Sequence, residues 1–244
     1  MDWSRAPAVE GTFYPKGETL LRSTVEELLA NAQWDEPPQE DSALSPGTIV
    51  PKAIIAPHAG YVYSGPIAAS AYSLIIPAGD RIKRVVLLGP AHRYPVRGMA
   101  ACSAASFHTP LGPVALDREG IREVLELDHV HFLDAAHEGE HSLEVHLPFL
   151  QVTLEDFTLI PLVVGEASPE EVAEVLRVLW GGPETLIVVS SDLSHFLTHA
   201  KASELDAETA RAVVDLRFDD IGFDQACGRM PMSGLLLRVR EEGL

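Results

Sequence analysis

The stretch that decides the fold is Ile54-Ile55-Ala56-Pro57-His58-Ala59-Gly60, a short apolar run that ends in a turn carrying a histidine. The same pattern recurs twice, at Val85-Val86-Leu87-Leu88-Gly89-Pro90-Ala91-His92 and at Leu186-Ile187-Val188-Val189-Ser190-Ser191-Asp192-Leu193-Ser194-His195. Such runs, bounded by Gly, Pro or Ser, are typical of strands buried on both faces of a parallel sheet. Ligands bind outside the carboxyl ends of these strands. The three histidines therefore predict a site at that edge, unless each of them merely caps its own turn.

Strand-like and helical segments alternate along the 244 residues, which predicts an α/β fold. We expect a single domain over residues 1–244, with a mostly parallel central sheet flanked by helices. The expected strands are 53–56, 84–88, 100–103, 157–164 and 185–190, and the expected helices are 18–33, 64–75, 121–127, 142–154, 169–180, 202–214 and 233–242. Pro161 predicts an edge or bulged strand, and Pro148 predicts a helix start or kink. Residues 107–113 are rich in turn formers, and 34–47 predict a mobile loop.

Composition narrows the classes of function. The formal net charge of −18 argues against a nucleic-acid backbone or an anionic membrane as partner, because both require clustered Lys and Arg. No apolar stretch reaches the roughly 18 residues that a transmembrane helix needs, and no secretory signal is visible at the start. Cys102 and Cys227 are the only cysteines, so no disulfide framework exists and a cytoplasmic location is expected.

The histidines and one cysteine are candidate metal ligands. His58, His92 and His195 come from distant parts of the chain, as expected of a site assembled at strand ends. Cys227 lies in a turn before the last predicted helix, where a thiolate could be a soft metal ligand or a nucleophile. The alternative for Cys227 is a small buried hydrophobic side chain, the usual role of a free cysteine.

The densest polar stretch is His137-Glu138-Gly139-Glu140-His141-Ser142-Leu143-Glu144-Val145-His146, which does not contain HExxH. His141, Glu144 and His146 could orient ligands or act as an acid or base, or the stretch could be a solvated charged loop. Asp192 could orient a ligand histidine or cap a helix. The chain has neither a GxSxG elbow nor a phosphate-binding glycine motif, so a seryl hydrolase and a nucleotide-binding protein have no support.

Together these motifs resemble the Memo-like family, known in prokaryotes as AmmeMemoRadiSam system protein B. The resemblance rests on six stretches: 5–15 (RAPAVEGTFYP), 55–65 (IAPHAGYVYSG), 88–92 (LGPAH), 140–148 (EHSLEVHLP), 189–195 (VSSDLSH) and 227–229 (CGR). It implies a fold related to the class III extradiol dioxygenases. It also implies an iron or copper site at His58, His92 and Cys227, with zinc as a further candidate metal.

Within that family site, His195 would be a fourth ligand or the group that contacts substrate or oxygen. His195 and Asp192 are the expected catalytic residues. His141, Glu144 and His146 would line the cleft. Ring-cleaving dioxygenases hold Fe(II) with two histidines and a carboxylate, so a thiolate in place of the carboxylate favours softer metals and puts simple dioxygenase activity in doubt. Family members usually continue past the last helix into another strand, which leads us to expect either that this chain is truncated at Leu244 or that a closing edge strand is missing.

Three functions follow as hypotheses. The first is a redox-active metalloprotein of dioxygenase ancestry. The second is a non-enzymatic module whose cleft binds a peptide or a partner protein, and the third is a metal-dependent hydrolase. The resemblance implies a radical SAM protein and an AMMECR-like protein as partners, beside an unknown small molecule or peptide.

Overall fold

The computed structural model describes residues 3–33 and 50–243. Its centre is a six-stranded sheet with the strand order β2-β9-β3-β8-β4-β7. In chain order these strands span Ala53–Ala56 (β2), Arg84–Pro90 (β3), Met99–Ala101 (β4), Val130–Phe132 (β7), Thr158–Val164 (β8) and Thr185–Ser190 (β9). Neighbouring strands from β2 to β8 are parallel, whereas β4 pairs with β8 in the antiparallel sense. The predicted mostly parallel central sheet is confirmed.

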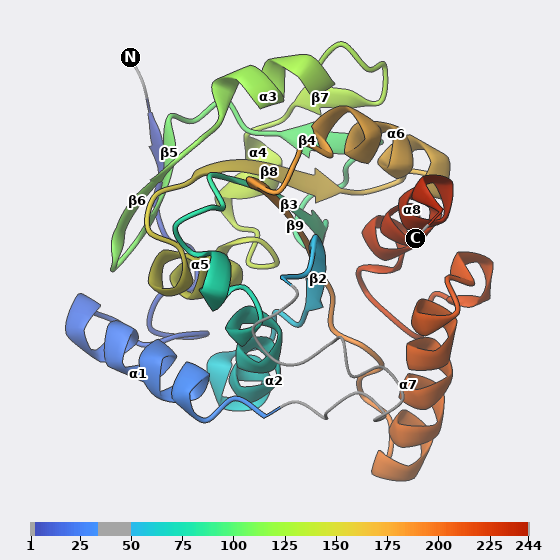
Figure 1. Cartoon of the computed structure of the whole chain (residues 1–244), viewed down its shortest axis with the longest axis horizontal. Coiled ribbons are helices and arrows are strands. Elements are labelled where there is room, and N and C mark those ends of the chain that lie inside the picture. Colours follow the sequence, from blue (N-terminus) through green and yellow to red (C-terminus); the bar gives the residue numbers. More distant parts are fainter. Residues whose placement is uncertain (1–2, 34–49, 244) are drawn as a thin grey trace.

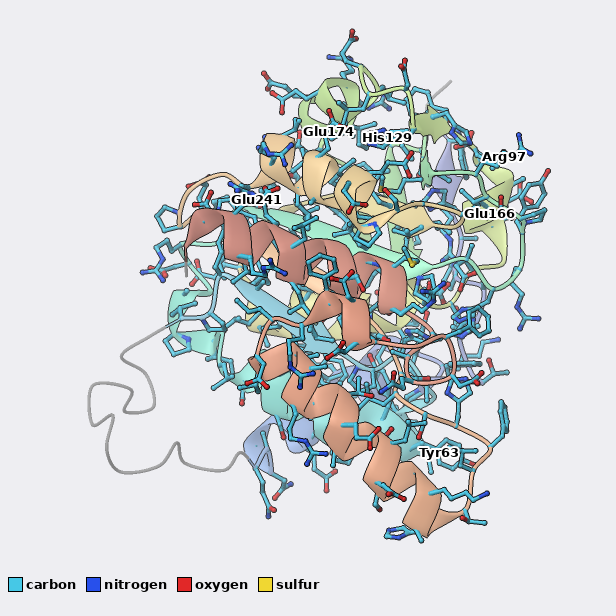
Figure 2. All side chains as sticks on the ribbon, turned by 90° about the vertical axis from the view of Figure 1, so that its right-hand side faces the viewer. Tyr63, Arg97, His129, Glu166, Glu174 and Glu241 are labelled. Atoms are coloured by element: carbon cyan, nitrogen blue, oxygen red, sulfur yellow. The ribbon has the colours of Figure 1, made fainter. Side chains whose placement is uncertain are left out.

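Helices cover both faces of this sheet (Figure 1). On one side α1 (Glu18–Ala30), α2 (Tyr61–Ser73) and α5 (Leu147–Thr153) pack against one another. On the other side lie α3 (Arg118–Val124), α6 (Pro169–Leu179) and α8 (Arg229–Glu242). Figure 2 looks onto this second side, where α8 lies along α6 and α7 (His199–Val214) extends below them. The predicted α/β architecture with flanking helices is therefore confirmed.

Strand β8 lies inside the sheet, between β3 and β4, so the expectation that Pro161 marks an edge strand is wrong. Alternate residues of a strand direct their backbone groups to the same neighbour. The carbonyl of Leu159 accepts from the N–H of Asp117 on the β4 side, and residue 161 faces the same way. On that side the ladder starts only where Leu162 pairs with Ala101. The missing N–H of proline therefore interrupts no bond of this ladder.

A second sheet has three strands, in the order β1-β5-β6. Its strands are Ser4–Arg5 (β1), Ser106–Thr109 (β5) and Gly112–Ala115 (β6). The turn-forming residues of 107–113 belong largely to the antiparallel β5–β6 hairpin, whose tip lies between Thr109 and Gly112. The parallel pairing of β1 with β5 draws the side chain of Arg5 into the interior. The loop predicted at 34–47 lies outside the described residues.

Two helices begin closer to candidate site residues than their apolar periodicity predicts. α2 starts at Tyr61, just after His58, and α8 starts at Arg229, just after Cys227. The expected helix start near Pro148 is confirmed, because this residue lies in the first turn of α5. Within residues 3–33 and 50–243, none of the helices combines the length and the apolar character needed to cross a bilayer.

Candidate metal centre

Three parallel strands end at one edge of the central sheet, and the turns that follow them meet there. His58 follows β2, His92 follows β3 and Asp192 follows β9. The carboxylate of Asp192 ties two of these turns together. Its Oδ1 accepts hydrogen bonds from the backbone N–H groups of His58, at 2.8 Å, and of Ala59, at 3.2 Å. At the edge that the sequence predicts, hydrogen bonds thus hold the turn after β2 against the turn after β9.

Three imidazoles gather at this edge. One nitrogen from each of His58, His92 and His141 lies within 4.8 Å of the others. The ring centroids are 5.1 Å apart for His58 and His92, and 4.8 Å apart for His92 and His141. His141 comes from the segment between α4 (Ala135–Glu138) and the 3-10 turn η2 (Glu144–His146), and not from a strand end. The cluster could hold one metal ion.

Cys227 adds a sulfur atom to this group. Its Sγ lies 3.3 Å from Nε2 of His58 and 3.6 Å from the backbone carbonyl oxygen of Asp192. Cys227 also contributes to raising the pKa of His92. Cys227 is half-buried and lies two residues before α8, so the helix start fixes its position.

The carboxylate of Glu140 holds His92 in place. Its Oε2 accepts from the backbone N–H of His92 at 2.6 Å, and its Oε1 lies 3.0 Å from the ring Nδ1. Burial raises the pKa of Glu140, but hydrogen bonds from His92 and Ser142 outweigh this effect and lower it to about 2. An ionised carboxylate only accepts hydrogen bonds, so Nδ1 of His92 carries a hydrogen. The Nε2 atom of this ring is left for the cluster.

The imidazoles of the cluster differ in their affinity for protons. Burial, together with the nearby His92 and His141, lowers the pKa of His58 to about 3. Burial also lowers the pKa of His141. For His92 burial acts in the same direction, but the hydrogen bonds and charges of Cys227 and Glu140 outweigh it and raise the pKa to about 9. The surroundings therefore disfavour protonation of His58 and His141 and favour protonation of His92.

The residues present fit a transition-metal ion. Iron, copper and zinc all accept imidazole nitrogen, and thiolate sulfur suits zinc, Cu(I) and iron. The Nδ1 atom of His141 is buried and has no hydrogen-bond partner among the described residues. The Nδ1–H group of His92 donates a hydrogen bond to the carboxylate of Glu140. Such a bond commonly fixes the orientation of metal-binding histidines.

Comparison with known proteins shows the family of this chain. The family model described as Memo-like protein matches residues 5–232, which is most of the chain. The chain belongs to the Memo-like family. A MEMO1 family protein of Aquifex aeolicus is 35% identical over 240 residues, covering 96% of this chain and 84% of the relative. A MEMO1 family protein of Ignicoccus hospitalis is 36% identical over 228 residues, covering 87% of this chain and 76% of the relative.

In this Memo-like protein the two residues predicted to be catalytic lie at different depths. Oδ2 of Asp192 is 3.8 Å from Nε2 of His58, so this carboxylate contacts the cluster directly. His195 is exposed, and its Nδ1–H donates to the carbonyl of Leu193 at 2.7 Å. His195 lines the same cavity as His92 and Cys227 but lies outside the group of clustered imidazoles.

Glu144, which we expected to line the cleft, is fully buried behind it. Its carboxylate pairs with the guanidinium of Arg5 and accepts the hydroxyl hydrogen of Tyr14 at 2.6 Å. It also accepts the backbone N–H groups of Ala8 and Val9, at 2.7 Å and 3.0 Å. These contacts leave Glu144 no oxygen to direct at the cleft. It anchors the N-terminal segment of the Memo-like domain instead.

His146, also expected in the cleft, lies one layer deeper and contacts Ser190 at 2.8 Å. His141 does reach the cluster. The alternative of a solvated charged loop is wrong for this stretch, because Glu140, Glu144 and His146 are all buried. Glu140 is the residue that sequence reasoning missed. It directly precedes His141, but nothing in the local sequence distinguishes it from an exposed acid such as Glu138.

A cavity of about 1350 Å³ opens beside the centre. His92, His195 and Cys227 form part of its wall, and the remainder is largely apolar. Arg97 and Glu166 belong to the same wall, and Figure 2 shows them close together at one margin of the molecule. In the Memo-like fold two of the candidate metal ligands, His92 and Cys227, thus face this cavity.

Proposed function

We propose that this Memo-like protein binds a single iron or copper ion and uses it in a redox reaction. The observation that carries the proposal is the convergence of His58, His92 and His141 within 4.8 Å, with Sγ of Cys227 3.3 Å from Nε2 of His58. His58 and His92 belong both to this cluster and to the ligand set that the family resemblance implies. We assign His141 as the third nitrogen ligand and keep Cys227 as the proposed sulfur ligand.

The chemical character of the donors supports a metal that changes oxidation state. Three imidazoles and a thiolate suit copper and iron, which would supply one-electron chemistry when bound, and they also suit zinc. Asp192 would hold the His58 turn and present Oδ2 to the centre. His195, exposed on the cavity wall, would contact a substrate or oxygen from outside the ligand set.

A second candidate function is supported by the rim of the cavity. Phe196 is 100% exposed and Phe223 is 80% exposed, and both line the cavity. Large exposed aromatic side chains are common at surfaces that bind proteins or peptides. A non-enzymatic interaction module would use these residues and would not depend on the metal. The third hypothesis, a metal-dependent hydrolase, rests on the ligands alone.

The cellular location and the partner proteins are also proposals. We propose a cytoplasmic location, in keeping with two unpaired cysteines. We further propose an AMMECR-like protein and a radical SAM protein as partners, on the strength of the family resemblance. Co-purification of a tagged chain from its native cells, with and without the other two proteins, would test the partnership.

Metal analysis of protein purified without added metal tests the proposed function. We expect close to one iron or copper per chain, lost in His58→Ala and in Cys227→Ser, while circular dichroism shows both variants folded. Zinc in place of iron or copper, with hydrolysis of model esters that His92→Ala abolishes, would favour the hydrolase. A folded protein that neither contains nor takes up any metal would overturn the proposal in favour of the interaction module.

A further inference from the structure

A buried hydroxyl lies directly behind the metal centre. Ser190, at the end of β9, is completely buried, and its Oγ has three polar neighbours. The carbonyl oxygen of Ser142 lies at 2.6 Å, Nδ1 of His58 at 2.6 Å and Nε2 of His146 at 2.8 Å. This single oxygen therefore connects a candidate metal ligand to a histidine that has no place in the ligand set.

Counting hydrogens settles the direction of each of these bonds. A serine hydroxyl has one hydrogen to donate and two lone pairs with which to accept. The carbonyl of Ser142 can only accept, so the hydroxyl hydrogen of Ser190 is directed there. Both histidines must then donate to the lone pairs of Oγ. His58 consequently carries its hydrogen on Nδ1, and His146 carries its hydrogen on Nε2.

We propose that Ser190 is a positioning residue that holds His58 in the Nδ1–H tautomer and so keeps the Nε2 lone pair directed at the metal centre. A neutral imidazole has one N–H and one lone pair, and a metal binds the lone pair. The opposite tautomer would place the bare Nδ1 of His58 against an oxygen with no hydrogen left to donate. That arrangement would leave two buried polar atoms unpaired, which is costly in the protein interior.

The hydrogen bond between His146 and Tyr72, at the other end of this chain of bonds, agrees with the same assignment of hydrogens. With its hydrogen on Nε2, His146 has a lone pair on Nδ1, and this atom lies 2.9 Å from the hydroxyl of Tyr72. Tyr72 is fully buried and stacks on Phe149, with the two ring centroids 5.1 Å apart. Its hydroxyl donates to His146, so each member of the chain from Tyr72 to His58 is satisfied by a single assignment of hydrogens.

The surroundings keep both histidines neutral, as this assignment requires. Both rings are buried, and burial lowers the pKa of His146 to about 3. The nearest carboxylate to His58 is that of Asp192, with Oδ2 3.8 Å from Nε2. On the side of the metal centre, Nε2 of His58 lies 3.3 Å from Sγ of Cys227. A bare Nε2 is free to accept from the thiol or to bind a metal.

The inference deepens the proposed function, but the tautomer itself is a property of the metal-free protein. Long-range ¹H–¹⁵N spectra of metal-free protein labelled at histidine distinguish the two tautomers of a ring. We expect Nδ1–H for His58 and Nε2–H for His146, with assignments made from His58→Gln and His146→Gln. An Nε2–H signal for His58 in the parent protein would overturn the proposal, and this result needs no variant of Ser190.

Metal affinity then tests the consequence. In a zinc competition titration against a chelator, we expect Ser190→Ala to weaken binding by about 10–100-fold, the usual effect of removing a group that orients a ligand histidine. Ser233→Ala, at another buried serine, is the matched control and should bind as the parent does.

The two proposals fail in distinguishable ways. If the parent protein binds no metal but shows the expected tautomers, the proposed function is wrong and the hydrogen-bond assignment stands. If Ser190→Ala binds zinc as tightly as the parent does, the positioning role is wrong whatever the metal used in the cell.

Discussion

The carboxylate of Glu140 contacts His92 twice, at the backbone N–H through Oε2 at 2.6 Å and at the ring Nδ1 through Oε1 at 3.0 Å. One buried acid thus fixes both the turn after β3 and the orientation of the ring at its end. Glu140 makes two more contacts within its own segment, because Oε1 also accepts from the backbone N–H groups of His141 and Ser142, each at 3.0 Å. The same carboxylate therefore holds the ring of His92 and the backbone of His141.

Glu140→Gln should weaken metal binding by about 10–100-fold, because the neutral amide orients His92 less well and no longer supplies a negative charge. Zinc competition titration of the variant and the parent measures the change. Glu138→Gln is the matched control, since Glu138 is an exposed neighbour in the same segment. Equal affinities for all three proteins would show that Glu140 has only a structural role.

His141 and His195 should respond differently to removal. His141→Ala takes a nitrogen out of the cluster, so we expect a loss of zinc affinity beyond the roughly 10–100-fold typical of an outer partner. His195→Ala should keep the metal content of the parent, because this ring is exposed on the cavity wall. A loss of metal in His195→Ala with full retention in His141→Ala would reverse our assignment of the two residues.

Tyr14→Phe should destabilise the fold by about 1.5–3 kcal/mol, because it removes a buried hydrogen bond to the charged Glu144. Urea denaturation followed by circular dichroism gives the free energy of unfolding. Tyr63→Phe is the matched control, since Tyr63 is 82% exposed on α2, and should change stability by less than about 0.5 kcal/mol (Figure 2). Metal content should be the same in all three proteins, because Glu144 anchors the N-terminal segment and not the cluster.

Lowering the pH should destabilise the protein at pH values well above those at which carboxylates titrate. Burial lowers the pKa of His146 to about 3 and that of His137 to about 4, from an ordinary value of 6.5. At pH values between these lowered pKa values and 6.5, the unfolded chain binds more protons than the folded chain does. The free energy of unfolding therefore falls as the pH drops below about 6.5. Each such histidine contributes a slope of up to about 1.4 kcal/mol per pH unit.

Urea denaturation of metal-free protein at several values between pH 7 and pH 5 measures this slope. His137→Gln should reduce it, because the variant has one fewer histidine that is buried in the neutral form. A stability that stays constant over this range would contradict the prediction for the parent protein.

Much of the fold follows from local pattern. The buried strands at 53–56, 84–88 and 185–190 agree with β2, β3 and β9 because continuous β-branched runs leave few alternatives. The helix at 169–180 likewise agrees with α6, where Ser168 forms a capping box with Glu171. The short strands β1 and β7 were not predicted, because two or three residues carry too little pattern.

The placement of Pro161 shows where local rules fail. Proline in a strand indicates an edge only if its missing N–H would otherwise have paired with a neighbour. Here the adjoining strand β4 stops at Ala101, opposite Leu162, and its end is a property of the sheet and not of the sequence around residue 161.

By itself, the sequence determined the long buried strands β2, β3, β8 and β9, the edge at which His58, His92 and Asp192 gather, and the family. These follow because strand periodicity is local and because parallel strands share one carboxyl edge. Only the tertiary structure decided that His141 joins the cluster while His195 remains outside it. It also decided that Glu140 contacts His92, whereas Glu144 pairs with Arg5. The roles of such side chains depend on neighbours far away in the chain, and the tautomer of His58 depends on a hydrogen that Ser190 gives to Ser142.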